Sequence, residues 1–186
     1  MAENLCPFWV GYLLVSPVRR WFQNPERILG PYIKAGMTAL DVGCAMGFFS
    51  LPIARMVGPD GRVVCVDIQE RMLQALRRRA LKAGVADRIT ARVCNQNSLG
   101  LRDLEGRIDF VIAFAVVHEV PDASAFLLDI FRVMKPDARC LVAEPKMHTS
   151  LKQFKRTICA AEEKGLAIVE RPAVPASHAV LFGKRA

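Results

Sequence analysis

Short apolar runs alternate with helix-forming segments along most of this chain, and this alternation limits the fold more than any other feature. The runs have the length of buried strands, and most are followed by a segment whose apolar residues recur at helical spacing. Such an order predicts a parallel sheet covered by helices on both faces. The predicted strands occupy residues 37–43, 62–68, 89–94, 108–117 and 139–145.

The predicted helices have recognisable first and last residues. Asn24 precedes Pro25 and Glu26, which is the order of a cap, a first helical position and an acidic first turn. Ser150 is placed to cap a helix over 150–165, and Gly84 to end one over 69–85. Further helices are predicted over 48–57 and 123–135, the second of them stopped by a proline at 136. Two closing strands, 166–172 and 177–183, are expected to pair antiparallel.

Length and composition fit one globular domain. The chain has 186 residues, 52% of them hydrophobic, and no apolar run reaches the roughly 20 residues that span a membrane. We therefore predict a single domain over 1–186, with an N-terminal helical segment at 1–33 and a core at 34–186. The six cysteines form no C-x-x-C pair, which predicts reduced thiols in the cytoplasm and no zinc site. The net charge of +8 favours either plain solubility or an anionic partner.

The N-terminal segment is apolar first and basic afterwards, which is the wrong order for a secretory signal. Two interpretations remain open. The segment either packs over the domain as a lid, with Phe8, Trp9, Tyr12 and Trp21 covering a cleft, or lies on a membrane surface or partner. At this length the chain has no large inserted substrate domain, so either this segment or a second subunit of a homodimer supplies the lid.

The stretch ALDVGCAMGFFS, residues 39–50, is typical of a strand, a glycine turn and a helix. Gly43 permits the sharp turn, and the free N–H groups of the following helix favour a carboxylate or phosphate. Phe48 stands where the dinucleotide fingerprint has a glycine for close helix packing, which disfavours a dinucleotide. Asp41, at the end of the strand, suits a ligand ammonium group. The loop therefore favours an amino acid moiety.

Asp67 ends the next strand, where an acidic residue typically binds ribose hydroxyls. LDVGCAMG, VVCVDI, CNQNSL, IDFVIAFAVVHEV and MKPDARCLVAEP together resemble a class I S-adenosylmethionine-dependent methyltransferase over residues 35 to 145. The resemblance implies a Rossmann-like α/β/α sandwich with a seven-stranded, mostly parallel sheet in the order 3-2-1-4-5-7-6 and an antiparallel C-terminal strand. It also implies S-adenosylmethionine as cofactor and S-adenosylhomocysteine as product.

The resemblance assigns roles to individual residues. Asp41 would bind the methionine ammonium, and Asp67 the ribose hydroxyls. The remaining cofactor contacts implied are Gly43, Cys44, Ala45, Gly47, Ile68 beside the adenine, Asn95 or Asn97 after the third strand, and Phe114. Ala45 departs from the commoner glycine, and its methyl is tolerated where the local φ is negative.

AFAVVHEV, at the end of the fourth predicted strand, resembles the sequence found at this place in small-molecule methyltransferases. The N/D-P-P-Y/F motif of nucleic-acid methyltransferases is not present. We therefore expect a small-molecule acceptor, and nucleic acid is disfavoured. His118 is the first candidate general base, because histidine titrates near neutrality, followed by Glu144 and His148. No metal is required. The alternatives are a protein that binds S-adenosylmethionine without catalysis, a methyltransferase acting on RNA or protein, a nicotinamide oxidoreductase, and a thiol-dependent enzyme using Cys44 and Cys6.

Overall fold

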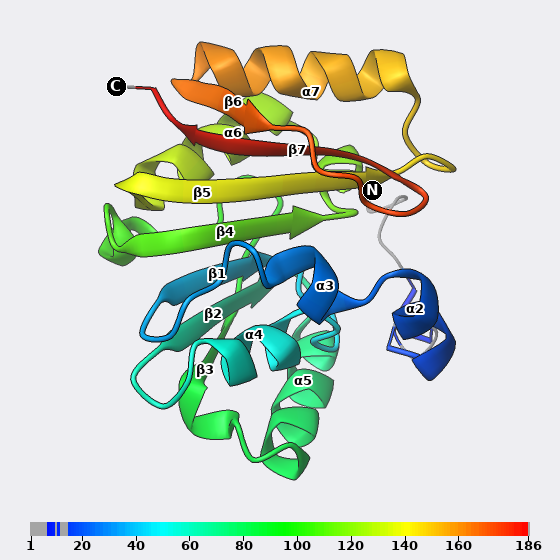
Figure 1. Ribbon diagram of the computed structural model, residues 1–186, viewed down its shortest axis with the longest axis vertical. Coiled ribbons are helices and arrows are strands. Elements are labelled where there is room, and N and C mark those ends of the chain that lie inside the picture. Colours follow the sequence, from blue (N-terminus) through cyan, green and yellow to red (C-terminus); the bar gives the residue numbers. More distant parts are fainter. Residues whose placement is uncertain (1–6, 10, 12–14, 186) are drawn as a thin grey trace.

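The computed structural model describes residues 7–9, 11 and 15–185, in which a twisted sheet lies between layers of helices (Figure 1). In this part of the chain the sheet has seven strands in the order β3-β2-β1-β4-β5-β7-β6. The first five strands pair in parallel, and β7 pairs antiparallel with both β5 and β6. The predicted fold is therefore confirmed, including its antiparallel closing strands. The strands are β1 (Thr38–Val42), β2 (Arg62–Asp67), β3 (Ile89–Val93), β4 (Ile108–Phe114), β5 (Met134–Pro145), β6 (Leu166–Glu170) and β7 (Ser177–Lys184).

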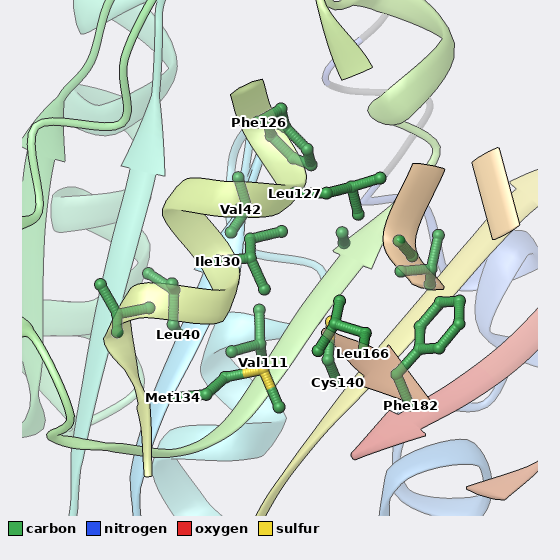
Figure 2. Close-up of a cluster of buried hydrophobic side chains, with 14 of the residues drawn as sticks. Leu40, Val42, Val111, Phe126, Leu127, Ile130, Met134, Cys140, Leu166 and Phe182 are labelled. Carbon is green, nitrogen blue, oxygen red and sulfur yellow. The ribbon is translucent and has the colours of Figure 1, made fainter. Parts of the chain in front are cut away.

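Alternate side chains of the central strands enter opposite helix layers, as the pleat of a strand requires. Ala39 of β1 packs in the cluster covered by α3, α4 and α5, whereas Leu40 and Val42 pack in the cluster covered by α6 and α7. Figure 2 shows the second cluster, where Val111 of β4 lies near Ile130 of α6. The helices are α2 (Pro17–Phe22), α3 (Pro25–Leu29), α4 (Ser50–Met56), α5 (Glu70–Lys82), α6 (Ala123–Val133) and α7 (Leu151–Glu163).

The helix before β5 is shorter than predicted. α6 ends at Val133, and Met134 has extended backbone with φ −68° and ψ 137°. The predicted end at Lys135 is wrong, because Pro136 disfavours helical backbone at the residue before it, which is Lys135. Lys135 instead forms an ion pair with Asp109, with 2.6 Å between Nζ and Oδ1.

β4 is also shorter than the apolar run that predicted it. The strand ends at Phe114, because Ala115 adopts a positive φ of 58° and turns the chain. Val117 then begins a 3₁₀ turn, Val117–Glu119, instead of continuing the sheet. This turn brings the next residues over the carboxyl ends of the strands.

The strand–helix alternation fails between β3 and β4. Residues 94–107 contain a 3₁₀ turn at Arg102–Leu104 and no α-helix. The polar stretch at 95–98 is left exposed at the carboxyl end of β3. Within the described residues, no helix is long and apolar enough to cross a membrane.

Candidate functional site: a cleft at the carboxyl ends of the strands

A cavity of about 1110 Å³ lies at the carboxyl ends of β1, β2 and β4, the place where open α/β sheets bind ligands. Gly47 and Glu144, two of the predicted site residues, are not among its lining residues. The other predicted residues all line it: Asp41, Gly43, Cys44, Ala45, Asp67, Ile68, Asn95, Phe114 and His118.

Asp41 brings a buried carboxyl group to the floor of this cavity. Burial raises its pKa to about 7, against the opposing hydrogen bond from the Ser50 hydroxyl, whose oxygen lies 2.5 Å from Asp41 Oδ2. The nearby carboxylate of Asp67 raises the pKa further, and the Arg19 guanidinium lowers it. A carboxyl group poised in this way would become charged when a cationic ligand group binds beside it.

Asp67 has a structural role that its sequence position did not reveal. The backbone N–H of Ala45 donates to Asp67 Oδ2 at 2.8 Å, and that of Gln69 donates to Oδ1 at 2.8 Å. Burial nevertheless raises the pKa of Asp67. The carboxylate therefore links the glycine turn after β1 to the start of α5, while Asp67 still lines the cavity.

Ala45 does not satisfy the condition under which its methyl was expected to be harmless. Its φ is +45°, in the left-handed region that glycine prefers. A non-glycine residue there carries a strain of about 1 kcal/mol. The hydrogen bond to Asp67 fixes this conformation, so the strained residue and the carboxylate form one unit.

The two glycines of the turn differ in what surrounds them. Gly43 lines the cavity, and a Cβ added to it would lie only 2.7 Å from Val116. The missing side chain of Gly43 therefore lets Val116, in the turn after β4, pack against the loop after β1. A Cβ on Gly47 would lie 2.3 Å from Leu76 and 2.6 Å from Leu51. Gly47 therefore serves the packing of α4 against α5, and its predicted contact with the cofactor stays a prediction.

Asn95 forms a turn at the rim of the cavity. Its side-chain oxygen accepts the backbone N–H groups of Asn97 and Ser98, both at 2.9 Å. The amide nitrogen is therefore the group left to a ligand, which suits an acceptor atom of an adenine ring rather than its amino group. Asn97, the alternative candidate, also lines the cavity.

Arg19 of α2 is a lining residue that the sequence did not single out. Its guanidinium carbon lies 4.2 Å from the ring centroid of Phe48 and 5.5 Å from that of Phe114. Burial lowers the pKa of Arg19 to about 10, although the neighbouring Asp41 raises it. The one available signal was the pattern of α2, in which Val18, Trp21 and Phe22 form an apolar face that excludes both Arg19 and Arg20.

His118 and Glu144 form a pair beside the cavity. Glu144 is 1% exposed; its Oε1 accepts the N–H groups of Val116 at 3.2 Å and Val117 at 2.7 Å, and Thr149 donates to its Oε2 at 3.3 Å. The same Oε2 contacts Nδ1 of His118, and this hydrogen bond raises the pKa of the imidazole. Because Glu144 holds Nδ1–H, Nε2 of His118 is the nitrogen available as a base.

Two further side chains flank this imidazole. The ring of His148 stacks on that of His118 with centroids 5.6 Å apart, and Glu119 Oε1 lies 4.0 Å from His118 Nε2. His148 and Glu119 both line the cavity. No group of three or more metal-ligating side chains is found among the described residues.

The thiol of Cys44 is a poor nucleophile in this position. Burial raises its pKa well above the ordinary value, so the thiolate is disfavoured. Cys6 and Tyr12, two of the residues predicted to contribute from the N-terminal segment, lie outside the described residues. Trp9 and Trp21, which were predicted to cover the cleft, do not line the cavity and have 65% and 90% of their surfaces exposed. Nearby, Phe8 and Val15 pack on the cluster formed by Met46 and Met72, so the described part of this segment contacts the cavity wall.

A family model for a methyltransferase domain matches residues 33–177. The match covers the elements from β1 to β6 and ends at the first residue of β7. The chain belongs to the methyltransferase domain family. This confirms the class I S-adenosylmethionine-dependent methyltransferase that the motifs predicted, and with it the cofactor.

Relatives of this methyltransferase are longer than the region they share with it. A demethylmenaquinone methyltransferase of Symbiobacterium thermophilum is 34% identical over 119 residues, which are 64% of this chain and 47% of the relative. The ubiquinone/menaquinone biosynthesis C-methyltransferase UbiE of Hahella chejuensis is 35% identical over 113 residues, 60% of this chain and 44% of the relative. The chain thus spans about half the length of the curated relatives it matches.

A solved structure matches nearly the whole chain. The SAM-dependent methyltransferase from Aquifex aeolicus superposes with a TM-score of 0.85 at 24% identity, covering 96% of this chain and 98% of that one. At this identity the likeness supports the fold alone.

Proposed function

We propose that this methyltransferase transfers a methyl group from S-adenosylmethionine to a small-molecule acceptor. One observation carries the proposal. Two buried carboxyl groups, Asp41 and Asp67, lie at the carboxyl ends of neighbouring parallel strands and line a single cavity together with the glycine turn after β1. A ligand that combines an ammonium group with a ribose is the natural complement of this arrangement.

The residues of the cavity fit that cofactor. Asp41 would accept the ammonium, which would favour the charged form of its carboxyl group. The carboxylate of Asp67, which lines the cavity, would accept the ribose hydroxyls, and Ile68 would offer apolar surface to the adenine. The cofactor supplies an electrophilic methyl group when bound.

We further propose an acceptor whose hydroxyl group loses its proton to a base. The resulting phenolate attacks the methyl group through a ring carbon, the S–CH3 bond breaks to leave S-adenosylhomocysteine, and the ring carbon then releases its proton to water. His118 supports the first of these steps, because Glu144 fixes Nδ1 as the donor and leaves Nε2 to take the proton. Relatives named for demethylmenaquinone and for ubiquinone and menaquinone biosynthesis make the hydroxylated ring of a reduced quinone the first class to test. On this proposal Glu144 is a positioning residue and His118 the catalytic base.

The test is formation of S-adenosylhomocysteine from S-adenosylmethionine with a short-chain demethylmenaquinol, under reducing conditions. We expect product only when the quinol is present. Removing the base with His118→Asn should lower the turnover by about 100-fold or more. The matched control is His178→Asn, because His178 stacks on Phe154 of α7 and does not line the cavity.

The outcomes separate the parts of the proposal. Product formation that is equal in wild type and His118→Asn would exclude a base at this position. Binding of S-adenosylhomocysteine without turnover on any quinol, phenol or catechol would exclude the acceptor class and favour a binding protein. Tight binding of NADH in place of S-adenosylhomocysteine would contradict the cofactor.

A further inference from the structure

The amphipathic pattern of α2 is reversed. Val18, Trp21 and Phe22 stand at positions i, i+3 and i+4 and therefore share one face of the helix. This apolar face is turned outward, with 66%, 90% and 67% of the respective residue surfaces exposed. The charged Arg19 instead points into the cavity, over the ring of Phe48. A helix that only packed on the domain would have its apolar face inward and its charges outward.

This outward face lies at the mouth of the cavity. Figure 1 shows α2 beyond the carboxyl end of β4, at the same edge of the sheet as the loop between β5 and α7. That loop contributes Met147, which lines the cavity and exposes 92% of its surface. Gln23, directly after α2, binds the carbonyl of Pro175 at 3.2 Å, so α2 is attached to the rim.

Positive charge accompanies the apolar side chains. Arg20 lies on α2 itself, Arg27 is exposed on α3, and Lys146 is exposed in the loop between β5 and α7, whereas the acidic Asp122, exposed directly before α6, also lines the cavity. Glu26 forms an ion pair with Arg20 and so removes part of that charge. The chain as a whole carries a net charge of +8. A basic surface with protruding aromatic side chains is typical of proteins that lie on an anionic membrane interface.

We propose that the outward face of α2 docks on the surface of an anionic lipid bilayer and places the mouth of the cavity against it. A second copy of the chain fits this face less well. Two aromatic side chains and a valine offer roughly 150–250 Å² per aromatic residue, which is below the roughly 800 Å² per partner that a stable dimer buries. A bilayer has no such threshold, because the affinity for a membrane surface grows with each aromatic ring placed at the headgroup level and with the attraction of basic residues to anionic lipids.

The test is co-sedimentation of the protein with vesicles of phosphatidylcholine in which about a third of the lipid is phosphatidylglycerol. We expect binding to these vesicles that weakens when the salt concentration rises and that is weaker on phosphatidylcholine alone. The double substitution Trp21→Ser with Phe22→Ser should weaken the partition about tenfold or more, and Arg20→Gln about fivefold.

Leu81→Ser provides a matched control. Leu81 exposes 70% of its surface, close to the value for Phe22, but lies near the end of α5, at the opposite edge of the sheet. This variant should bind vesicles as wild type does. The melting temperature of each variant shows whether it is folded.

Either of two results would overturn the proposal. One is the absence of wild-type binding to anionic vesicles, or binding that the double substitution leaves unchanged. The other is a wild-type dimer in gel filtration that the double substitution converts to monomer, which would assign the face to a second copy.

Discussion

At the scale of single residues, Ala45 holds a conformation that glycine adopts with less strain. Its φ of +45° is fixed by the 2.8 Å hydrogen bond from its N–H to Asp67. The methyl group gains little in return, because the residue is only half-buried beside Met46 and Met72. The turn that would contact the cofactor is therefore slightly strained.

Ala45→Gly should relieve this strain. We expect the free energy of unfolding to rise by about 0.5 kcal/mol, because the relief of about 1 kcal/mol is partly offset by the greater freedom of glycine in the unfolded chain. Thermal or urea unfolding measures the change. Ala113→Gly is the control: Ala113 lies in β4 with ordinary strand backbone, and its substitution should lower the stability by about 1 kcal/mol. A lower free energy of unfolding for Ala45→Gly than for wild type would show that the backbone of Ala45 is not strained.

The His118–Glu144 pair makes a second prediction at this scale. The hydrogen bond to Glu144 raises the pKa of His118, so the folded protein holds this proton more tightly than the unfolded chain. The resulting stabilisation is complete below the ordinary histidine pKa of about 6.5 and disappears as the pH rises through the raised value. Base catalysis would begin above that same value.

An NMR titration of the histidine side chains measures this pKa directly. We expect a value above the ordinary one for His118 in wild type and a lower value in Glu144→Gln, because the amide removes the negative charge and keeps an acceptor for Val117. His118→Asn identifies the resonance. A His118 pKa that Glu144→Gln leaves in place would show that the carboxylate does not set it.

At the scale of elements, Gly47 determines how closely α4 approaches α5. Gly47→Ala should be destabilising because the new Cβ would lie 2.3 Å from Leu76 and 2.6 Å from Leu51, in addition to the strain of a φ of +81°. Gly58→Ala isolates that strain, since Gly58 has a φ of +71° and a Cβ added to it would meet no atom within 4 Å.

The two substitutions should differ by about 1–3 kcal/mol in the free energy of unfolding, the usual cost of overpacking a core. Urea unfolding of both variants gives this difference. Equal losses of stability would show that the leucine side chains move aside freely and that Gly47 is not required for packing.

Sequence patterns predicted the strands well, because their apolar runs are short and bounded by turns. They placed Asp41, Asp67 and His118 at the carboxyl edge, where the structure has them. They could not predict the partner of His118, since Glu144 reaches it only after Ala115 turns the chain with a positive φ. Arg19 was missed for a similar reason: a short helix does not reveal which of its sides faces inward.

At the scale of the whole molecule, the cavity couples ligand binding to pH through Asp41. Burial raises the pKa of this carboxyl group to about 7, so the ligand-free fold loses stability as the pH rises from the ordinary aspartate pKa of about 3.9 to that value, and no further loss follows above it. Below it the carboxyl group is neutral and gives a ligand ammonium no opposite charge.

The affinity for S-adenosylhomocysteine should therefore be about tenfold lower at one pH unit below the pKa of Asp41 than at a pH well above that pKa. Calorimetric titration over this range measures it. Asp41→Asn should bind weakly at every pH and show no such dependence. A pH dependence that persists in Asp41→Asn would assign it to another group.

The central claim is that this cavity binds S-adenosylmethionine and its product. It is tested most directly by the thermal stability of the wild-type protein with S-adenosylhomocysteine at about 100 times its dissociation constant, beside Asp41→Asn and beside NADH. We expect a stabilisation of about 2.7 kcal/mol for wild type with S-adenosylhomocysteine, and little or none in the other two samples. No stabilisation of wild type by S-adenosylhomocysteine, or an equal one by NADH, would contradict the claim.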